Sequence, residues 1–301
     1  MRESNEENNI PPSKSNEKDN DNKGIEIKPI KDKKTIHGEF FVAFASILLL
    51  YVAYIFVFQQ MSPFTVSTII IDAFYVFIFG MAIWAYIIVM KTPPGSIPLY
   101  WGFYIGDKDE KRKRYCLICN AFKPERSKHC SICNECVLNM DHHCPWVNNC
   151  IGFFNRKYFM QFIFYVELSL IYNFIFSLIF LSKKFPLVKE NKINMFYYIF
   201  LCINCAAVGT AAFLFGRFVI YHINLVIINS TTIEHLDAEN KDKYLKFRLS
   251  VQENIEQVFG KNKLFWLLPI IAEEGRPVGD GMLWTTKENN QQLVNELDQR
   301  F

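Results

Sequence analysis

Four long apolar segments in the 301-residue sequence limit the folds that the chain can adopt. Each is long enough to cross a hydrocarbon core of about 30 Å as a helix that rises roughly 1.5 Å per residue. A buried core helix could account for one such segment, but four of them indicate an all-α polytopic membrane protein with four transmembrane helices. The predicted spans are Gly38–Gln59, Val66–Met90, Phe159–Leu181 and Phe196–Phe215.

The fourth apolar segment runs on to Asn229, which is longer than a bilayer requires. Arg217 interrupts it, and a cation inside the hydrocarbon core is costly. We therefore expect the span to end at Phe215 and the remaining residues to continue as a helix that leaves the membrane.

The spans divide the chain into five predicted regions. They are an N-terminal tail (residues 1–37), the first two spans (38–90), a cysteine-rich domain (91–158), the third and fourth spans with the helical extension (159–229) and a C-terminal region (230–301). The tail has few large apolar residues to offset its ordering entropy, so we expect it to be disordered. Its first apolar run is too long for a cleavable signal peptide, so none is expected.

Lysine and arginine are unevenly distributed around these spans. Eight precede the first span, eleven lie in residues 91–158 and nine follow residue 229, but residues 60–65 hold none. Because cytoplasmic loops carry an excess of these residues, both termini and the cysteine-rich domain are predicted to be cytosolic. The four lysines of residues 182–195 run against this pattern, but the earlier loops usually dominate. On the cytosolic side the glycosylation sequon at Asn229 would stay unused.

Seven of the nine cysteines lie between Cys116 and Cys150, inside the predicted cytosolic domain. A reducing compartment disfavours disulfides and favours metal binding or catalysis. Three histidines in the same stretch bring the number of candidate ligands to ten. Tetrahedral structural zinc takes four ligands, so two sites use eight residues and leave two over.

The spacing of these ligands repeats with a period of 14 residues. Two cysteines separated by two residues are followed after nine residues by a histidine and after six more by a cysteine, and the whole pattern occurs twice. A sequential division would place the neighbours His129 and Cys130 on one metal, which strains the backbone. We therefore predict two interleaved structural zinc sites. The first consists of Cys116, Cys119, His129 and Cys136, and the second of Cys130, Cys133, His143 and Cys150.

His142 and Cys144 are the two residues left over, and Asp141 precedes them. A thiol with a pKa of about 8.5 is mostly protonated at neutral pH. His142 could accept the thiol proton, and Asp141 could hold the imidazole in the tautomer that does so. The three residues thus predict a nucleophilic cysteine, although a lone cysteine would more often be an inert buried thiol.

Cys144 lies shortly before the third span, so its thiol should be at the cytosolic membrane face. A nucleophile there could attack a thioester whose head group is in water and whose chain is in lipid, as in long-chain acyl-CoA. Five basic residues near the cluster could bind its phosphates, or could simply anchor the domain at the membrane. They are Lys123, Arg126, Lys128, Arg156 and Lys157.

The central motif is C-x₂-C-x₃-K-P-x-R-x₂-H-C-x₂-C-x₂-C-x₄-D-H-H-C-P-W-V-N-N-C-I-G, from Cys116 to Gly152. It closely resembles the cysteine-rich domain of the DHHC-type protein S-acyltransferases, or palmitoyltransferases. Thr231-Thr232-Ile233-Glu234 is similar to that family's T-T-x-E motif, and residues 254–260, with Trp266 and Pro269, resemble its C-terminal motif. The resemblance covers Gly38–Pro269.

The resemblance implies an all-α membrane enzyme that works by a ping-pong cycle. Cys144 takes an acyl group from acyl-CoA and passes it to cysteine thiols of membrane-associated proteins, with His142 as base and Asp141 as its orienting partner. Carried over by motif position, Lys123 and Arg126 match a basic pair, and Trp146 lies beside the active site. We expect the protein in the endomembrane system, in the Golgi or the endoplasmic reticulum.

Four other features of the sequence bear on these predictions. The zinc domain could belong to a non-catalytic scaffold that binds cytosolic partners; a nucleic-acid partner is not expected, because no basic recognition helix is present. Asp72 and Glu167 inside the spans could mark a transport path, although pairing with a neighbouring helix is the simpler explanation. Cys202 and Cys205 are expected to be small packing residues.

Two serines inside the spans could leave room for an acyl chain of sixteen carbons. They are Ser169, about 15 Å along the third span, and Ser46 in the first span.

Overall fold

The computed structural model describes residues 36–60, 65–98, 101–102, 114–237, 239 and 241–286. Contacts divide the chain into residues 1–33 and residues 34–301, and all described residues belong to the second unit. The predicted N-terminal tail, apart from residues 36 and 37, lies outside the described residues.

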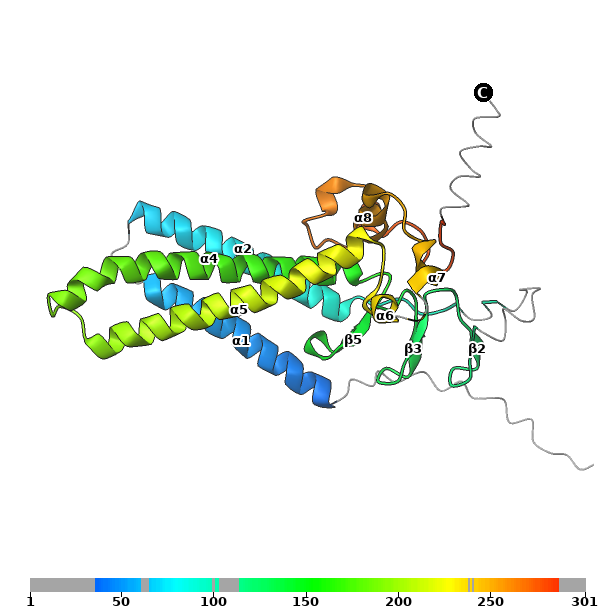
Figure 1. Ribbon diagram of the computed structural model, residues 1–301, viewed down its shortest axis with the longest axis horizontal. Coiled ribbons are helices and arrows are strands. Elements are labelled where there is room, and N and C mark those ends of the chain that lie inside the picture. The colour runs from blue at the N-terminus through cyan, green and yellow to red at the C-terminus, as the bar shows by residue number, and fades with distance from the viewer. Residues whose placement is uncertain are drawn as a thin grey trace, which may run out of the picture. The chain divides into compact units, whose positions relative to one another are not determined.

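Four long helices correspond to the four predicted spans (Figure 1). They are α1 (Ile36–Gln60), α2 (Val66–Lys91), α4 (Arg156–Lys189) and α5 (Met195–Ile227). α2, α4 and α5 are long and apolar enough to cross a membrane, and the described side chains of α1 form a shorter apolar helix over Gly38–Ala53. α4 is longer than the predicted third span at both ends. α5 continues without a break to Ile227, so the residues after the predicted end of the span at Phe215 are helical.

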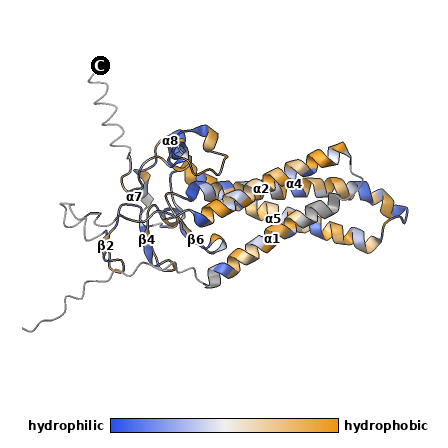
Figure 2. Cartoon of the chain, turned by 180° about the vertical axis from the view of Figure 1, so that it is seen from behind, coloured by the Kyte–Doolittle hydropathy of each residue, from blue (hydrophilic) through white to orange (hydrophobic). Residues whose placement is uncertain are grey.

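α4 lies between α2 and α5 and also contacts α1. Its buried residues Tyr165, Val166 and Leu170 pack against Ile78 of α2 and Ala212 of α5. Exposed apolar residues lie on all four helices, and the ribbon is mainly hydrophobic along them and more hydrophilic around the strands (Figure 2). Helices that are apolar on all sides are typical of a hydrocarbon environment.

The cysteine-rich segment forms three antiparallel hairpins that the prediction of an all-α fold does not include. The strands are β1 (Tyr115–Cys116) with β2 (Ala121–Phe122), β3 (Lys128–Cys130) with β4 (Glu135–Val137), and β5 (His142–Cys144) with β6 (Asn149–Ile151), the last pair joined by η1 (Pro145–Val147). Asn120, Asn134 and Asn148 turn the hairpins with φ of 50°, 56° and 46°. Asparagine tolerates this left-handed region, and the three lie 14 residues apart. The repeat in the sequence is therefore a repeat of hairpins.

Two asparagines join the cysteine-rich segment and the C-terminal region to helix ends, where backbone carbonyls lack partners within the helix. Asn149 of β6 donates through Nδ2 to the carbonyls of Val89 and Thr92 at the end of α2. Asn254 donates through Nδ2 to the carbonyl of Ile227, the last residue of α5. Gly152 follows β6 where a Cβ would lie 2.8 Å from the carbonyl oxygen of Pro94, so a larger residue would not fit.

The C-terminal region consists of short elements around the cytosolic-side ends of α4 and α5 in the predicted orientation. They are α6 (Thr232–Leu236), α7 (Lys241–Leu245), α8 (Val251–Phe259), η3 (Lys263–Phe265) and η4 (Glu273–Gly275). Thr231 and Glu234 form a capping box at the start of α6, which gives the T-T-x-E motif a local structural reason. Ser250 and Glu253 form the same arrangement at α8.

Candidate active site and metal centres

The hairpins bring the ten candidate ligands into two groups of four and leave His142 and Cys144 apart. In each group the ligand atoms lie within 4.8 Å of one another. The groups are the two interleaved sets that the spacing predicts: Cys116, Cys119, His129 and Cys136, and Cys130, Cys133, His143 and Cys150. β3 carries one ligand of each group, His129 and Cys130, so these neighbouring residues lie in different groups.

The distances inside each group fit a tetrahedral ion. Zinc bonded to sulfur at about 2.3 Å implies a separation of about 3.8 Å between sulfurs. The Sγ atoms of Cys119 and Cys136 are 3.6 Å apart, and those of Cys133 and Cys150 are 3.4 Å apart. His129 Nδ1 lies 3.2 Å from Cys119 Sγ, and His143 Nδ1 lies 3.4 Å from Cys133 Sγ. Both groups can therefore hold a metal ion with a closed set of four ligands.

The two adjacent histidines of β5 have different surroundings because side chains alternate across a strand. His143 lies with the second metal group. His142 and Cys144 are two residues apart in the strand and share its other face. Cys144 is buried and belongs to the same apolar cluster as Tyr86 and Phe159. One short strand thus separates a metal ligand from a thiol and imidazole pair.

Asp141 holds the His142 ring. Its Oδ2 lies 2.7 Å from His142 Nδ1, and the carboxylate also accepts bonds from the Thr232 backbone N–H at 3.0 Å and the Thr232 hydroxyl at 2.8 Å. Arg156 Nη2 lies 3.5 Å from its other oxygen. With Nδ1 facing the carboxylate, Nε2 of His142 is the nitrogen that can exchange a proton with a thiol.

The protonation of this pair follows from its partners. Burial alone would raise the pKa of the Asp141 carboxyl, but the Arg156 guanidinium and the hydrogen bond with His142 bring that pKa well below its usual range. Burial alone would lower the pKa of His142, but hydrogen bonds with Asp141 and Cys144 raise it to about 9. His142 therefore holds a proton more strongly than an ordinary imidazole does.

His222 is a site residue that sequence analysis misses. It lies on α5, is buried, and its ring centroid is 5.8 Å from that of His142. Phe159 packs against both histidine rings with centroids 5.2 Å away. The signal in the sequence is a histidine seven residues after the predicted end of the fourth span, where the helical extension passes the cysteine-rich domain.

Trp146 lies in η1, directly after Cys144. Its ring contacts that of Phe41 of α1 edge-on, with centroids 5.2 Å apart, and its carbonyl accepts a bond of 2.8 Å from the Tyr86 hydroxyl of α2. These contacts join the loop after Cys144 to the first two helices, so the tryptophan lies beside the site as the resemblance implies.

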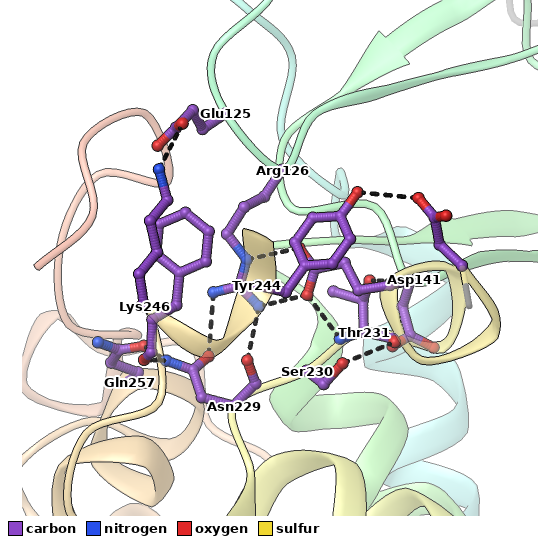
Figure 3. A network of polar contacts seen from close by, with 12 residues as sticks. Glu125, Arg126, Asp141, Asn229, Ser230, Thr231, Tyr244, Lys246 and Gln257 are labelled. Carbon is purple, nitrogen blue, oxygen red and sulfur yellow. Dashed lines mark hydrogen bonds and ion pairs between the residues drawn. The ribbon is translucent and has the colours of Figure 1, made fainter. Parts of the chain in front are cut away.

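Three of the basic residues predicted to bind acyl-CoA are instead partnered inside the fold. Arg126 donates to both carboxylate oxygens of Glu234 at 2.7 Å and to the carbonyl of Asn229 at 2.9 Å (Figure 3). Arg156 donates to the carbonyl of Ser230 at 2.6 Å, and Lys157 to that of Gly275 at 2.9 Å. All three are at most 5% exposed, so their positions do not support the expectation that they bind phosphates.

The buried ion pair of Arg126 and Glu234 should contribute much more to stability than the partly exposed pair nearby. Arg126→Ala leaves the Glu234 carboxylate, whose side chain is 1% exposed, without its cation, and should cost about 3–5 kcal/mol. Lys246→Ala breaks the ion pair between Lys246, whose side chain is 38% exposed, and Glu125, whose side chain is 28% exposed. This change should cost at most about 1 kcal/mol. Thermal unfolding of the purified protein measures both. Equal shifts in Tm would mean that the buried pair does not hold α6 to the cysteine-rich domain.

Lys123 lies in a different setting. It lines a cleft of about 600 Å³ together with Arg114, Lys128, Lys243 and Lys246. Arg126, which is paired with Glu234, also lines this cleft. Six cations around one cleft, with Glu125 as the acidic residue of its lining, make a site suited to an anionic group.

An apolar cavity of about 390 Å³ lies among the four helices. Leu49 of α1, Phe79 of α2, Ser169 of α4 and Phe215 of α5 are among the residues that line it. Phe215 also packs against the apolar cluster that contains Cys144, so the cavity adjoins this cluster. Ser169 lies in the wall, as the sequence suggests, and its hydroxyl donates to the carbonyl of Tyr165. Ser46, whose hydroxyl donates to Val42, is not among the lining residues.

Of the two acids inside the spans, Glu167 of α4 lies against α5. A Cβ added at Gly216 would be 2.9 Å from Glu167 Oε1, so the glycine makes room for the carboxylate. The contact is one of packing: Glu167 Oε2 has no hydrogen-bond partner among the described residues, so the structure does not show the expected pairing.

Comparison with known proteins places these features in a family. The family model of the DHHC palmitoyltransferases matches residues 109–239. Probable protein S-acyltransferase 14 of Arabidopsis thaliana is 33% identical over 228 residues, which are 66% of this chain and 71% of the relative. Probable protein S-acyltransferase 13 of the same plant is 30% identical over 253 residues, 74% of this chain and 80% of the relative. Human palmitoyltransferase ZDHHC15 is 38% identical over 190 residues, covering 61% and 54%.

The chain is thus an acyltransferase with a Cys/His-rich domain between apolar helices. It belongs to the DHHC palmitoyltransferase family.

Proposed function

We propose that this protein S-acyltransferase moves a long-chain acyl group from acyl-CoA to cysteine thiols of membrane-associated proteins through an acyl intermediate on Cys144. The arrangement of Asp141, His142 and Cys144 carries the proposal, because a buried carboxylate fixes an imidazole on the same strand face as the thiol. Family membership supports the reaction class.

Two displacements complete the cycle. His142 takes the proton of Cys144, and the thiolate attacks the thioester carbonyl of acyl-CoA. The tetrahedral intermediate collapses with cleavage of the bond to the CoA sulfur, and His142 returns the proton to that leaving thiolate. An acceptor thiol then loses its proton to His142 and attacks acyl-Cys144. The acyl group leaves on the acceptor, and Cys144 regains its proton.

Two zinc ions fit the two ligand groups, with the second held by Cys130, Cys133, His143 and Cys150 next to the active strand. Because four protein ligands leave no open coordination position on either ion, the role of the zinc ions is to stabilise the hairpins. The acid–base chemistry belongs to the residues of the other strand face.

We assign the cleft beside Lys123 to the phosphates of CoA. The cluster of cations there is suited to phosphate, and Lys123, unlike Arg126, is not buried and has no acid pairing in the described structure. The proposal predicts that Lys123→Ala raises the KM for palmitoyl-CoA with little change in kcat, since the chemistry is untouched. An unchanged KM would contradict the assignment.

The cavity among the helices is the proposed site of the acyl chain. Ser169→Phe puts an aromatic ring into its wall and should shift preference toward fourteen carbons or fewer, because each buried CH₂ is worth about 0.8 kcal/mol and overpacking costs more. Thr210→Phe is the matched control: Thr210 is exposed on α5, and its hydroxyl bonds to its own helix at Ala206 in the same way. Competition between acyl-CoA lengths measures the effect; an unchanged profile for Ser169→Phe excludes this serine from the chain-end wall.

The membrane arrangement proposed here has four spans, cytosolic termini and a cytosolic cysteine-rich domain, within the endomembrane system. The first four of the five regions end at residues 37, 90, 158 and 229, and the fifth follows residue 229. Three apolar helices of sufficient length and the shorter apolar stretch of α1 support it, together with the distribution of basic residues. Glycosylation sequons inserted at residues 60–65 and 182–195 should be modified in microsomes, whereas one inserted in the C-terminal region should not.

Incubation of the purified protein with labelled palmitoyl-CoA, without an acceptor, tests the function. An acyl-enzyme predicts a hydroxylamine-sensitive label on the peptide that contains Cys144. A membrane scaffold whose zinc domain only binds partners would bind palmitoyl-CoA weakly or not at all and would acquire no such label.

A further inference from the structure

The residues between α8 and η4 form an apolar segment with little regular structure. Its nine residues, Leu264–Ala272, carry no charge. η3 provides a single turn of helix at its start. Charged residues flank this apolar segment on both sides: Lys261 and Lys263 before it, and Glu273, Glu274 and Arg276 after it.

Side chains of α4 donate hydrogen bonds to five backbone carbonyls of the apolar segment. Gln161 Nε2 serves three of them, at 3.0–3.3 Å, and the hydroxyls of Tyr165 and Tyr158 serve one each, at 2.8 and 3.3 Å. The acceptors are the carbonyl oxygens of Phe265, Trp266, Leu268, Leu267 and Ile270. The three donors recur at helical spacing, so one face of α4 is a row of donors for this backbone.

Of these donors, Gln161 and Tyr165 lie within the predicted third span, and Tyr158 directly precedes it. α4 begins at Arg156, and at 1.5 Å per residue Gln161 and Tyr165 lie about 7 and 13 Å along it. A segment in water would satisfy its carbonyls with water. Irregular backbone at membrane depth persists only where protein supplies the hydrogen bonds, and α4 supplies them here.

Several side chains of the apolar segment are exposed, although Phe265, Trp266 and Ile270 are half-buried. Leu264 is 78% exposed, Leu267 59% and Ile271 61%. The neighbouring α4 surface is apolar as well, since Phe164 beside Tyr165 is 41% exposed. We propose that the apolar segment lies in the membrane interface at the Arg156 end of α4, with these side chains in lipid. The continuity with the apolar surface of α4 and the row of donors favour lipid over a protein partner as its occupant.

Photocrosslinking in lipid nanodiscs tests this placement. The photoreactive residue p-benzoylphenylalanine replaces Leu267 or Ile271 in the full-length protein, which is reconstituted in phosphatidylcholine and irradiated. Phe213, 65% exposed on α5, is the matched position on a span; Leu283, 77% exposed in the C-terminal region, is an equally exposed apolar position outside the apolar segment. Intact-mass analysis detects a shift of one phospholipid.

Adducts at Leu267 and Ile271 with a yield comparable to that at Phe213, and none at Leu283, would support the proposal. Adducts at Phe213 alone would overturn it, because the apolar segment would then be in water or covered by protein. Two positions are used so that a local folding defect at one of them does not decide the outcome. The readout does not depend on acyl transfer, so failure here leaves the assignment of Cys144 unaffected.

Discussion

Cys144→Ser is expected to abolish the hydroxylamine-sensitive label from palmitoyl-CoA while about two zinc ions per chain remain bound. The serine hydroxyl is far less acidic than a thiol, so His142 cannot generate a comparable nucleophile from it. The substitution removes one sulfur from a residue outside both metal groups, so the hairpins should keep their stability. Intact-mass analysis gives the label, and atomic absorption gives the zinc content of the same sample.

Cys130→Ser is the matched variant, because it makes the same chemical change in a buried metal ligand. It should lose about one zinc ion and lower the Tm, since structural zinc contributes folding free energy directly. Equal zinc loss in Cys144→Ser and Cys130→Ser would contradict the division of the ten candidates into eight ligands and a reactive pair.

His142→Ala is expected to keep both metals and to lose about 10²–10⁴-fold in the rate of acyl-enzyme formation, the usual contribution of a general base. His143→Ala, one residue away on the opposite strand face, should lose metal first. Raising the pH should partly restore the His142→Ala rate, because an unassisted thiol ionises near pH 8.5 and then needs no base. Single-turnover rates between pH 7 and pH 9.5, with zinc measured in parallel, test this.

The direction of the pH effect distinguishes two roles of His142. If the imidazole serves only to accept the thiol proton, the variant's rate rises with pH until the thiol is ionised. A rate that stays low at alkaline pH with zinc intact would mean that His142 contributes something else, such as holding the strand through its bond to Asp141.

The spans and metal ligands could be predicted from the sequence because their signals are local. A span is a run of apolar residues, and the ligands follow a repeat of 14 residues that survives as repeated hairpins. The hairpins themselves have strands of two or three residues, too short for an alternating pattern to be recognised. The turns at Asn120, Asn134 and Asn148 were the available signal.

The fate of the basic residues could not be predicted, because it depends on contacts between distant parts of the chain. Arg126 and Glu234 are 108 residues apart, and no local pattern shows that the guanidinium is already paired. A count of charges near a candidate site therefore overestimates the cations available to a ligand. Lys123 and Arg126 are separated by only two residues in one motif and both line the cleft, yet Arg126 is buried and paired with an acid.

The bond between Thr232 and Asp141 spans 91 residues of chain, including both later apolar helices. During synthesis Asp141, His142 and Cys144 emerge together, and Asp141 can already bond to His142. The bonds from Thr232 to this carboxylate form only after α4 and α5 have been made and the chain has turned back at α6. The partners of the Asp141 carboxylate are therefore completed by a late part of the chain and not by the segment that carries the cysteine.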